Sequence, residues 1–583
     1  MKGRSPLRRR KPKLLITIMV AVTALVAAFA AQTAFADPED RGNGNGNGNG
    51  NAEQLTAEEI VAEMQPGWNL GNTLDSTGDD ETSWGNPMVT EEQLEAIRAE
   101  GFKSIRIPVT WSQHQGEGPD YTIDADYLAR VQEVVDWALE DGFYVMINIH
   151  HDSWQWINTM PTQHDEVLAR YNATWTQLAE TFADAPPELV FESVNEPQFD
   201  DVEDAESHEL LHELNTSFHE IVRASGGNND SRVLILPTLH TSAEQVHLDP
   251  LLETIQGLDD PNIAATVHYY GYWPFSVNIA GYTTFNEEVQ QDIIDYFDRT
   301  RATFVDNGIP VILGEWGLLG FDKNTGTIEQ GEKLKFFEYL GYYANESQIT
   351  TMWWDNGQHF DRETFEWQDP DLFAHVATAW TERSGTGSTD QVFLRTGETP
   401  AAQTVTLNPN GQAFEGLYNG DTALAEGTDY TISGDELTLS AELLASLAGD
   451  GSLGEQAVLE ARFSGGVPWK LHVINFDTPT VADASGTTAE LAIPTEFNGD
   501  QLATMEAAYE DGTAAGPQNW TTYKEYDVAF LPDEEAGQVV LPEAFFAEVN
   551  DNSTVNLTFH FWSGETVSYT LTRSGSTVTG SAG

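Results

Sequence analysis

The sequence predicts an α/β protein, a (β/α)8 TIM barrel followed by two small all-β sandwich domains. Eight short β-prone runs alternate with amphipathic helical stretches across residues 52–383, which is the pattern of such a barrel. Beyond that region helical patterns become rare, and strand-like segments are separated by Gly, Asn and Asp turns. The length of 583 residues also exceeds that of one ordinary domain.

Each expected barrel strand is a short run rich in apolar and β-branched residues. The eight runs are residues 66–73, 102–109, 144–151, 189–197, 233–240, 263–270, 310–317 and 349–357. Helical spacing of apolar residues is clearest in residues 91–100 and 126–142. A doubly wound sheet is the rival arrangement, but no Gly-rich phosphate loop opens any of the helical stretches.

The first 36 residues have the pattern of a signal peptide. Seven basic residues precede an uncharged apolar run, and Ala34-Phe35-Ala36 forms a small-x-small cleavage signal. An uncleaved membrane anchor is the alternative, because the apolar run is nearly long enough to span a bilayer. We expect cleavage, and therefore a secreted, extracellular protein that is not attached to a membrane. Residues 37–51, rich in Gly and Asn, predict a flexible leader.

The charge balance excludes several classes of partner. Seven of the 27 basic residues lie in the signal segment, so the rest of the chain carries 20 basic against 93 acidic residues. Such a surface repels nucleic acid and anionic membranes and favours a neutral or cationic partner. The chain contains no cysteine, which excludes thiolate metal sites and cysteine nucleophiles and leaves the domains to be held by ordinary cores. We expect a monomer.

Polar and aromatic residues gather at the ends of the expected barrel strands. In a TIM barrel these ends meet on one face, where such barrels carry out their chemistry. Polar groups placed only for stability would not favour one end of so many strands. The residues are Asn72, Arg106, His150, His151, Asn195, Glu196, His268, Tyr270, Glu315, Trp353 and Trp354, with His240 as a further candidate.

Glu196 and Glu315 follow the fourth and seventh expected strands and should face each other across the barrel mouth. Two carboxylates on either side of a pocket suit glycoside cleavage, in which one protonates the leaving oxygen and the other attacks the anomeric carbon. Arg106 and Tyr270 are placed to keep Glu315 ionised, and Asn195 to hold a sugar 2-hydroxyl. The separation of the carboxylates, which distinguishes retention from inversion, stays open at this point.

The motifs GWNLGNTLD (67–75), RIPVTW (106–111), NIHHD (148–152), SVNEPQ (193–198), VHYY (267–270), ILGEWG (312–317) and WWDNG (353–357) complete the pattern. Together they resemble glycoside hydrolase family 5, and most closely its branch of endo-β-1,4-glucanases (cellulases) and xyloglucanases. The resemblance spans about residues 66–357.

The resemblance implies a retaining mechanism, with Glu196 as acid/base and Glu315 as nucleophile. It also implies supporting or substrate-binding roles, which fall on Arg106, His150, His151, Asn195, His268, Tyr270 and Trp354. Asn72 is a further supporting candidate because it ends the first expected strand. The expected substrate is a β-1,4-glucan, either cellulose-like or xyloglucan, and mannan and mixed-linkage β-glucan remain alternatives. A non-catalytic glucan-binding surface protein is the alternative from another class. An esterase is disfavoured because no G-x-S-x-G elbow is present.

No metal or other cofactor is expected. The adjacent His150 and His151 point to opposite faces if both lie on a strand, so they chelate poorly. The acidic run 75–81 lacks the spaced ligands of a calcium loop.

Two further modules follow the barrel. Residues 390–477 resemble the immunoglobulin-like module found beside cellulases, and we interpret them as a spacer after a linker at 384–389. Residues 478–577 are similar to a family 46 carbohydrate-binding module. Trp520, Tyr523 and Trp562 are its candidates for stacking on sugar, with core packing as the alternative for each. The same two readings stay open for the barrel residues Trp154, Trp156, Trp273, Trp316 and Trp353.

Overall fold

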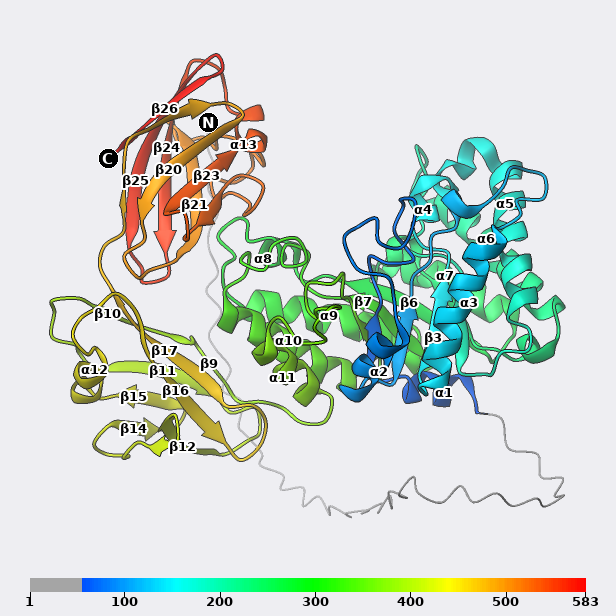
Figure 1. Cartoon of the computed structure of the whole chain (residues 1–583), viewed down its shortest axis with the longest axis horizontal. Helices are drawn as coiled ribbons and strands as arrows, with labels where there is room; N and C mark the ends of the chain where they lie inside the picture. The colour runs from blue at the N-terminus through cyan, green and yellow to red at the C-terminus, as the bar shows by residue number, and fades with distance from the viewer. Residues whose placement is uncertain (1–54) are drawn as a thin grey trace, which may run out of the picture. The chain divides into compact units, whose positions relative to one another are not determined.

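The computed structural model describes residues 55–583 (Figure 1). The predicted signal peptide, residues 1–36, and the predicted leader, residues 37–51, lie outside the described residues. Within the part that is described, every helix is too short or too polar to cross a membrane.

Eight parallel strands close into a barrel, which confirms the predicted TIM-barrel fold. They pair in chain order, and β8 pairs with β1 to complete the ring. The strands are β1 Gly67–Asn69, β2 Ser104–Ile107, β3 Tyr144–Asn148, β4 Leu189–Glu192, β5 Leu234–Pro237, β6 Ile263–Tyr269, β7 Val311–Trp316 and β8 Thr350–Trp353.

The strands are shorter than predicted, because the chain leaves the sheet before most of the polar residues at the mouth. Asn72, Glu196 and His240 have φ angles of 56°, 40° and 57°, in the left-handed region that strands do not use. The predicted strand 189–197 accordingly ends at Glu192. The polar residues after these strands therefore lie on short connections at the barrel mouth.

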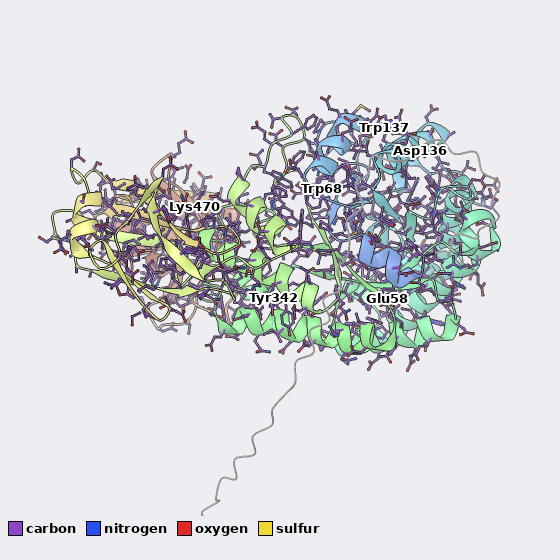
Figure 2. The ribbon with its side chains drawn as sticks, turned by 90° about the horizontal axis from the view of Figure 1, so that it is seen from below. Glu58, Trp68, Asp136, Trp137, Tyr342 and Lys470 are labelled. Atoms are coloured by element: carbon purple, nitrogen blue, oxygen red, sulfur yellow. The ribbon has the colours of Figure 1, made fainter. Side chains whose placement is uncertain are left out.

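Helices surround the barrel. The two clearest helical predictions, 91–100 and 126–142, correspond to α2 and α3, which begin after the capping side chains of Thr90 and Asp124. Figure 2 shows Trp137 and Asp136 on α3, while Trp68 of β1 is fully buried. The helices are α1 Ala57–Glu63, α2 Glu91–Ala99, α3 Ala125–Glu140, α4 Asp152–Gln155, α5 Met160–Thr181, α6 Asp204–Ala224, α7 Gln245–Leu258, α8 Trp273–Ser276, α9 Glu287–Thr303, α10 Gln330–Glu346 and α11 Pro370–Ala379, with 3-10 turns at Ser112–His114, Ile157–Thr159, Gly227–Asp230, Leu239–Thr241 and Val305–Asn307.

The barrel interior contains two chemically different layers. The lower layer is an apolar cluster that packs against α1, and its barrel members include Met146, Val190, Ile235, Ile312 and Met352. The upper layer is polar, and its members include Asn69, Arg106, Asn148 and Glu192, all fully buried. Because every second residue of a strand points inward, Met146 and Asn148 of β3 belong to the lower and upper layers respectively.

The second module consists of two sheets, as expected for a β-sandwich. Residues 384–389, predicted to be a linker, are part of it: Thr386 and Gly387 form β9, which pairs with β11, and Ser384 is buried. The five-stranded sheet has the order β10-β17-β16-β12-β13 and the four-stranded sheet β14-β15-β11-β9. Their elements are β9 Thr386–Gly387, β10 Gln391–Arg395, β11 Gln403–Asn408, β12 Phe414–Asn419, β13 Thr422–Ala423, β14 Tyr430–Ser433, β15 Glu436–Leu439, α12 Ala441–Leu447, β16 Gly454–Phe463 and β17 Trp469–Phe476.

The third module is a nine-stranded sheet with one short helix and a hydrophobic core of its own. Phe530, Phe545 and Phe559 are among the residues buried in that core. Its elements are β18 Thr480–Val481, β19 Ala484–Thr487, β20 Glu490–Glu496, β21 Leu502–Tyr509, β22 Leu531–Asp533, β23 Gln538–Pro542, α13 Glu543–Ala547, β24 Ser553–Phe561, β25 Thr566–Ser574 and β26 Thr577–Ala582.

Candidate active site

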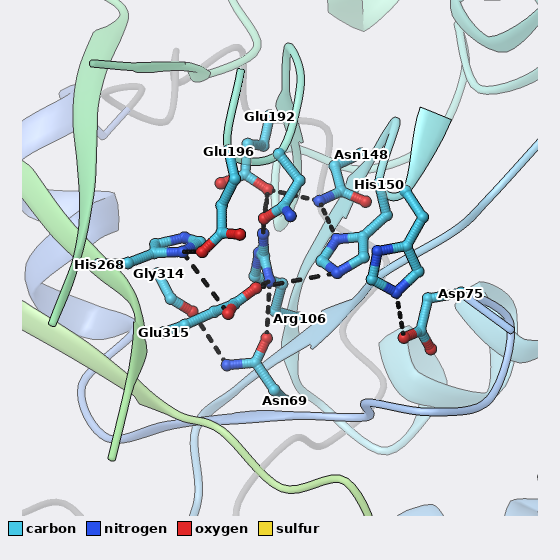
Figure 3. A network of polar contacts seen from close by, with 12 residues as sticks. Asn69, Asp75, Arg106, Asn148, His150, Glu192, Glu196, His268, Gly314 and Glu315 are labelled. Carbon is cyan, nitrogen blue, oxygen red and sulfur yellow. Dashed lines mark hydrogen bonds and ion pairs between the residues drawn. The ribbon is translucent and has the colours of Figure 1, made fainter. Parts of the chain in front are cut away.

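Arg106 is the centre of the polar network at the barrel mouth (Figure 3). Its Nη1 donates to Glu315 Oε1 at 2.7 Å, its Nε to Glu192 Oε2 at 2.9 Å, and its Nη2 to Asn195 Oδ1 at 2.7 Å. Burial lowers the pKa of the guanidinium, but the charges of Glu192 and Glu315 outweigh burial and leave that pKa above its ordinary value. Arg106 is therefore a permanent cation that orients two carboxylates and one amide.

Glu315 has the environment of an ionised carboxylate. Besides Arg106, the hydroxyl of Tyr270 donates to its Oε2 at 2.7 Å. Burial raises the pKa of Glu315, but the charges of His268 and Arg106 and the hydrogen bonds from Tyr270 and Arg106 leave it below its ordinary value. The preceding Gly314 is required, since a Cβ there would lie 2.7 Å from Thr266 Oγ1 and 3.0 Å from His268 Nε2.

Glu196 has a different environment from Glu315. Its side chain is 46% exposed, and His268 Nδ1 lies 3.0 Å from its Oε1. The backbone of Glu196 is left-handed, a strained conformation for this residue type that is found mainly at functional sites.

The two carboxylates lie close together. One oxygen of Glu196, one of Glu315 and one ring nitrogen of His268 all lie within 4.8 Å of one another. His268 Nδ1 is also 3.5 Å from Glu315 Oε2, so the imidazole bridges the two acids. An oxygen–oxygen separation this short is below the about 6.5–9.5 Å between the carboxyl groups of inverting glycosidases, which leave room for a water molecule.

His150 and His151 follow β3, and their hydrogen bonds show which ring nitrogen of each imidazole carries the proton. Asn148 Nδ2 contacts His150 Nδ1 at 3.0 Å, and Trp154 Nε1 donates to His151 Nδ1 at 3.0 Å. Each Nδ1 therefore accepts, and each Nε2 carries the proton. A metal bound at Nε2 would require moving both protons and losing both hydrogen bonds, so the donor set of Asp75, His150 and His151 suits direct hydrogen bonding better than metal binding.

The remaining predicted supporting residues also lie at the mouth. The ring of Trp354 is parallel to that of His150, with centroids 6.0 Å apart, and Gly71 allows its close approach. The backbone N–H of Asn72 donates to Asp75 Oδ2. His240 is exposed and has its closest aromatic contact with His247.

The barrel tryptophans divide between core and surface. Trp316 and Trp353 are buried, and Trp353 packs against Trp367 and His359, so both belong to the core. Trp156 is almost fully buried under Arg170. Trp154 and Trp273 are 46% and 44% exposed, and they retain a face available for sugar.

Sequence reasoning missed several residues of the network. Glu192 forms a buried ion pair with Arg106 at 2.8 Å and accepts from Asn148 Nδ2 at 2.7 Å. Asn69 accepts from Arg106 and donates to the carbonyls of Gly314 and Met352. A charged residue inside the apolar run LVFESV was the available signal for Glu192, because buried charges require partners.

The third module contacts the barrel near the mouth. Trp520 is 60% exposed, and its ring lies 6.2 Å from that of Trp273. The amide of Asn278 in the barrel donates to the carbonyl of Ala503 at 2.9 Å. Tyr523 is half-buried and faces Gly281 of the barrel, whereas Trp562 lines a separate cavity of about 1160 Å³ to which all three modules contribute. Of the three predicted stacking residues, Trp520 is thus the one that lies beside a barrel aromatic.

Three segments of the chain match known families in order. Residues 70–360 match cellulase (glycosyl hydrolase family 5), residues 386–473 match carbohydrate binding domain X2, and residues 477–581 match the family 46 carbohydrate binding domain.

Relatives extend the similarity to the whole chain. Endoglucanase B of Paenibacillus lautus is 51% identical over 579 residues, which is 99% of this chain and 100% of that protein. A full-length tri-modular endo-beta-1,4-glucanase B from Bacillus halodurans superposes with a TM-score of 0.90 at 51% identity, over 91% of this chain and 100% of that one. The structure also superposes on a tri-modular family 5, subfamily 4 endo-beta-1,4-glucanase from Bacillus licheniformis complexed with cellotetraose. The TM-score is 0.76 at 33% identity, over 91% of this chain and 99% of that one. The chain therefore belongs to glycoside hydrolase family 5 and is a glycoside hydrolase with two carbohydrate-binding domains.

Proposed function

We propose that the protein is a secreted, retaining endo-β-1,4-glucanase that cleaves internal bonds of cellulose-like glucans or xyloglucan. The observation that carries the proposal is the pair of carboxylates within 4.8 Å of each other, one held ionised and one exposed over the mouth. The relatives named endoglucanase support the choice of polymer.

In the first step an oxygen of Glu315 attacks the anomeric carbon of the sugar in the cleft. Glu196, as acid, gives its proton to the glycosidic oxygen, so the bond to the leaving sugar breaks and a glycosyl ester on Glu315 forms. In the second step Glu196 removes a proton from a water molecule, whose oxygen attacks the same carbon and releases Glu315. Two displacements restore the original anomeric configuration.

The supporting residues act through fixed hydrogen bonds. Because Asn195 Oδ1 accepts from Arg106, its Nδ2 is the free end of the amide and is available to donate to the sugar 2-hydroxyl, a contact that strengthens in the transition state. The pKa of His150 is held well below its ordinary value by burial and by the nearby His151, Arg106 and His268. His150 is thus neutral and donates from Nε2.

The chain is proposed to consist of three modules after its signal peptide and leader. We place the catalytic module at 52–383. The spacer, expected at 390–477, begins at 384 because β9 belongs to it, and the third module, expected at 478–577, extends to 582 because β26 belongs to it. We expect a monomer without a membrane anchor. We further infer that the aromatic pair Trp273 and Trp520 extends the polysaccharide path beyond the catalytic pair. Their 6.2 Å ring separation and their exposure support that role.

The test is reducing-sugar release by the full chain, compared with Glu315→Gln. Xyloglucan, carboxymethylcellulose, mixed-linkage glucan and mannan are assayed side by side, and the anomer formed first is read by NMR. Release from the glucans that disappears in the variant, with retention, is the expected result. If mannan is the preferred polymer, the proposed substrate is wrong. If the first product has the inverted anomeric configuration, the proposed mechanism is wrong. If folded protein releases no sugar from any of the four polymers, a non-catalytic glucan-binding protein is favoured.

A further inference from the structure

A buried lysine lies beneath the loop that carries Trp520 in the third module. Lys524 is the one lysine among residues 478–583, and it is fully buried. Its own N–H donates to the carbonyl of Met505 in β21 at 2.9 Å, which fixes its backbone to the sheet. Because a buried charge requires partners, the partners of the ammonium group indicate its role.

The ammonium group of Lys524 is held by backbone carbonyls of one loop. Its Nζ donates to Thr521 O at 2.8 Å and to Pro517 O at 2.9 Å, with a longer contact to Gln518 O at 3.4 Å. Burial lowers its pKa to about 8, and the charge of Glu548 offsets part of that decrease. At neutral pH the group is therefore mostly protonated and has three N–H bonds to donate. The cation closes the loop at three points.

Trp520 lies inside the loop that these contacts close. The N–H of Thr521 donates to the carbonyl of Gln518 at 3.2 Å, which makes Trp520 a central residue of a four-residue turn. Gln518 has a left-handed backbone with a φ of 51°, a conformation that is costly for this residue type and persists where surrounding contacts hold it. Since Trp520 is 60% exposed, these backbone contacts, rather than burial of the ring, set its direction.

The lysine also belongs to the segment through which the third module contacts the barrel. The carbonyl of Tyr523 accepts from the N–H of Ala280 at 3.4 Å, and the N–H of Tyr526 donates to the carbonyl of Asn278 at 3.3 Å. Lys524 lies between these two contacts in the chain. Its ammonium group therefore links the loop of the third module to the part of that module that is bonded to the barrel.

The barrel side of these contacts carries the other ring of the aromatic pair. Trp273 begins α8, and Asn278 and Ala280 follow that helix. We propose that Lys524 is a positioning residue that holds Trp520 beside Trp273 and so preorganises the aromatic pair for a polymer chain. The proposal rests on the proposed function. A turn that is ordered before binding loses little further entropy when a sugar stacks on its ring.

Activity on a polymer and on a small substrate separates positioning from a general loss of function. Lys524→Met keeps a similar side-chain length but removes the charge and the donors. It should raise the KM for soluble polymer by about three- to tenfold, as expected for loss of the Trp520 ring itself. The kcat/KM for an aryl β-cellobioside, which lacks a polymer chain, should remain that of wild type. An unchanged polymer KM in the folded variant would overturn the proposal.

A double variant tests whether Lys524 acts through Trp520. Trp520→Ala combined with Lys524→Met should have the polymer KM of Trp520→Ala alone, because both substitutions then remove the same contact. Effects that multiply would show that the lysine acts elsewhere and would overturn the proposal.

Val578→Ala is the matched control for stability. It truncates a fully buried side chain of β26 in the core of the same module. It should lower the melting temperature and leave the polymer KM unchanged. A rise in KM equal to that of Lys524→Met would show that weakening the module is sufficient, and would also overturn the positioning role.

Hydrogen exchange examines the loop directly. In Lys524→Met the amides of residues 517–523 should exchange about tenfold faster than in wild type, while the amides of β24 keep their protection and show that the module is folded. Unchanged exchange in the loop would contradict the proposal even if the KM rises. If β24 also loses protection, the milder Lys524→Gln, which keeps an amide donor, is measured in the same way and decides. If wild type cleaves none of the polymers, the proposed function fails, while exchange still decides whether Lys524 holds the loop.

Discussion

The two layers of the barrel interior show two uses of the same strands. The lower layer packs Met146, Val190, Ile235, Ile312 and Met352 against α1, and such burial stabilises the fold through removal of apolar area from water. The upper layer buries charges and amides around Arg106, an arrangement that costs desolvation and adds little net stability. One layer holds the barrel together, and the other holds the candidate catalytic groups in position.

Glu315→Gln is expected to separate activity from stability most clearly, because it changes the polar upper layer and leaves the apolar lower layer intact. Loss of the nucleophile should lower kcat on the order of 10⁴-fold or more, while the melting temperature changes little because Arg106 keeps its ion pair with Glu192. Rate and thermal melting are measured on the same preparation. A variant with substantial residual glucanase activity would assign the nucleophile to another residue.

Arg106→Met should damage both activity and stability. It removes a hydrogen-bond donor from the nucleophile, a loss of about 10²- to 10³-fold in kcat, and leaves Glu192 buried without its cation, at about 3–5 kcal/mol of unfolding free energy. Kinetics and denaturant unfolding measure the two effects. An active, fully stable Arg106→Met would contradict the role given to the network.

Ile312→Ala tests the lower layer alone. The cavity should reduce the free energy of unfolding by about 2–5 kcal/mol, because Ile312 is fully buried among apolar neighbours. The kcat of the folded protein should remain that of wild type at temperatures well below its melting point. A large fall in kcat would show that the two layers are coupled.

Asp322, on the connection after β7, gives the stability of the protein a dependence on pH. Burial raises the pKa of its carboxyl well above the ordinary 3.8, and the charges of Asp355 and Glu315 add to the increase. The folded state therefore binds this proton more tightly than the unfolded chain, and the associated stability is lost as pH rises through the raised pKa. The melting temperature of wild type should fall more between about pH 4 and pH 9 than that of Asp322→Asn. Parallel curves for the two proteins would refute the assignment.

Trp520→Ala should have the smallest effect of the series. On soluble polymer its KM should rise by about three- to tenfold because one aromatic face is lost, while hydrolysis of a short aryl cellobioside stays unchanged. Trp562→Ala, a substitution in the same module but in the separate cavity, is the matched control. Equal effects of both variants would indicate a general weakening of the module instead of a sugar contact at Trp273.

Much of the architecture follows from local patterns. Eight alternating βα runs predicted the barrel, and strand-ending motifs brought Glu196, Glu315, Arg106, His268 and Tyr270 to one face. Strand ends were less predictable, since left-handed residues such as Asn72 and Glu196 leave the sheet early. The linker expected at 384–389 was wrong because Ser384 and β9 pack into the second module, a long-range event that composition does not encode.

The sequence by itself determined the fold class, the family and the identity of the two candidate catalytic carboxylates, since these depend on periodicity and on specific motifs at strand ends. Only the tertiary structure decided which tryptophans are core, that Glu192 shares Arg106 with Glu315, and that Trp84 and Trp154 meet on one histidine. The reason is physical: a side chain's exposure and its ion-pair partner depend on residues distant in the chain, which only the folded packing brings together.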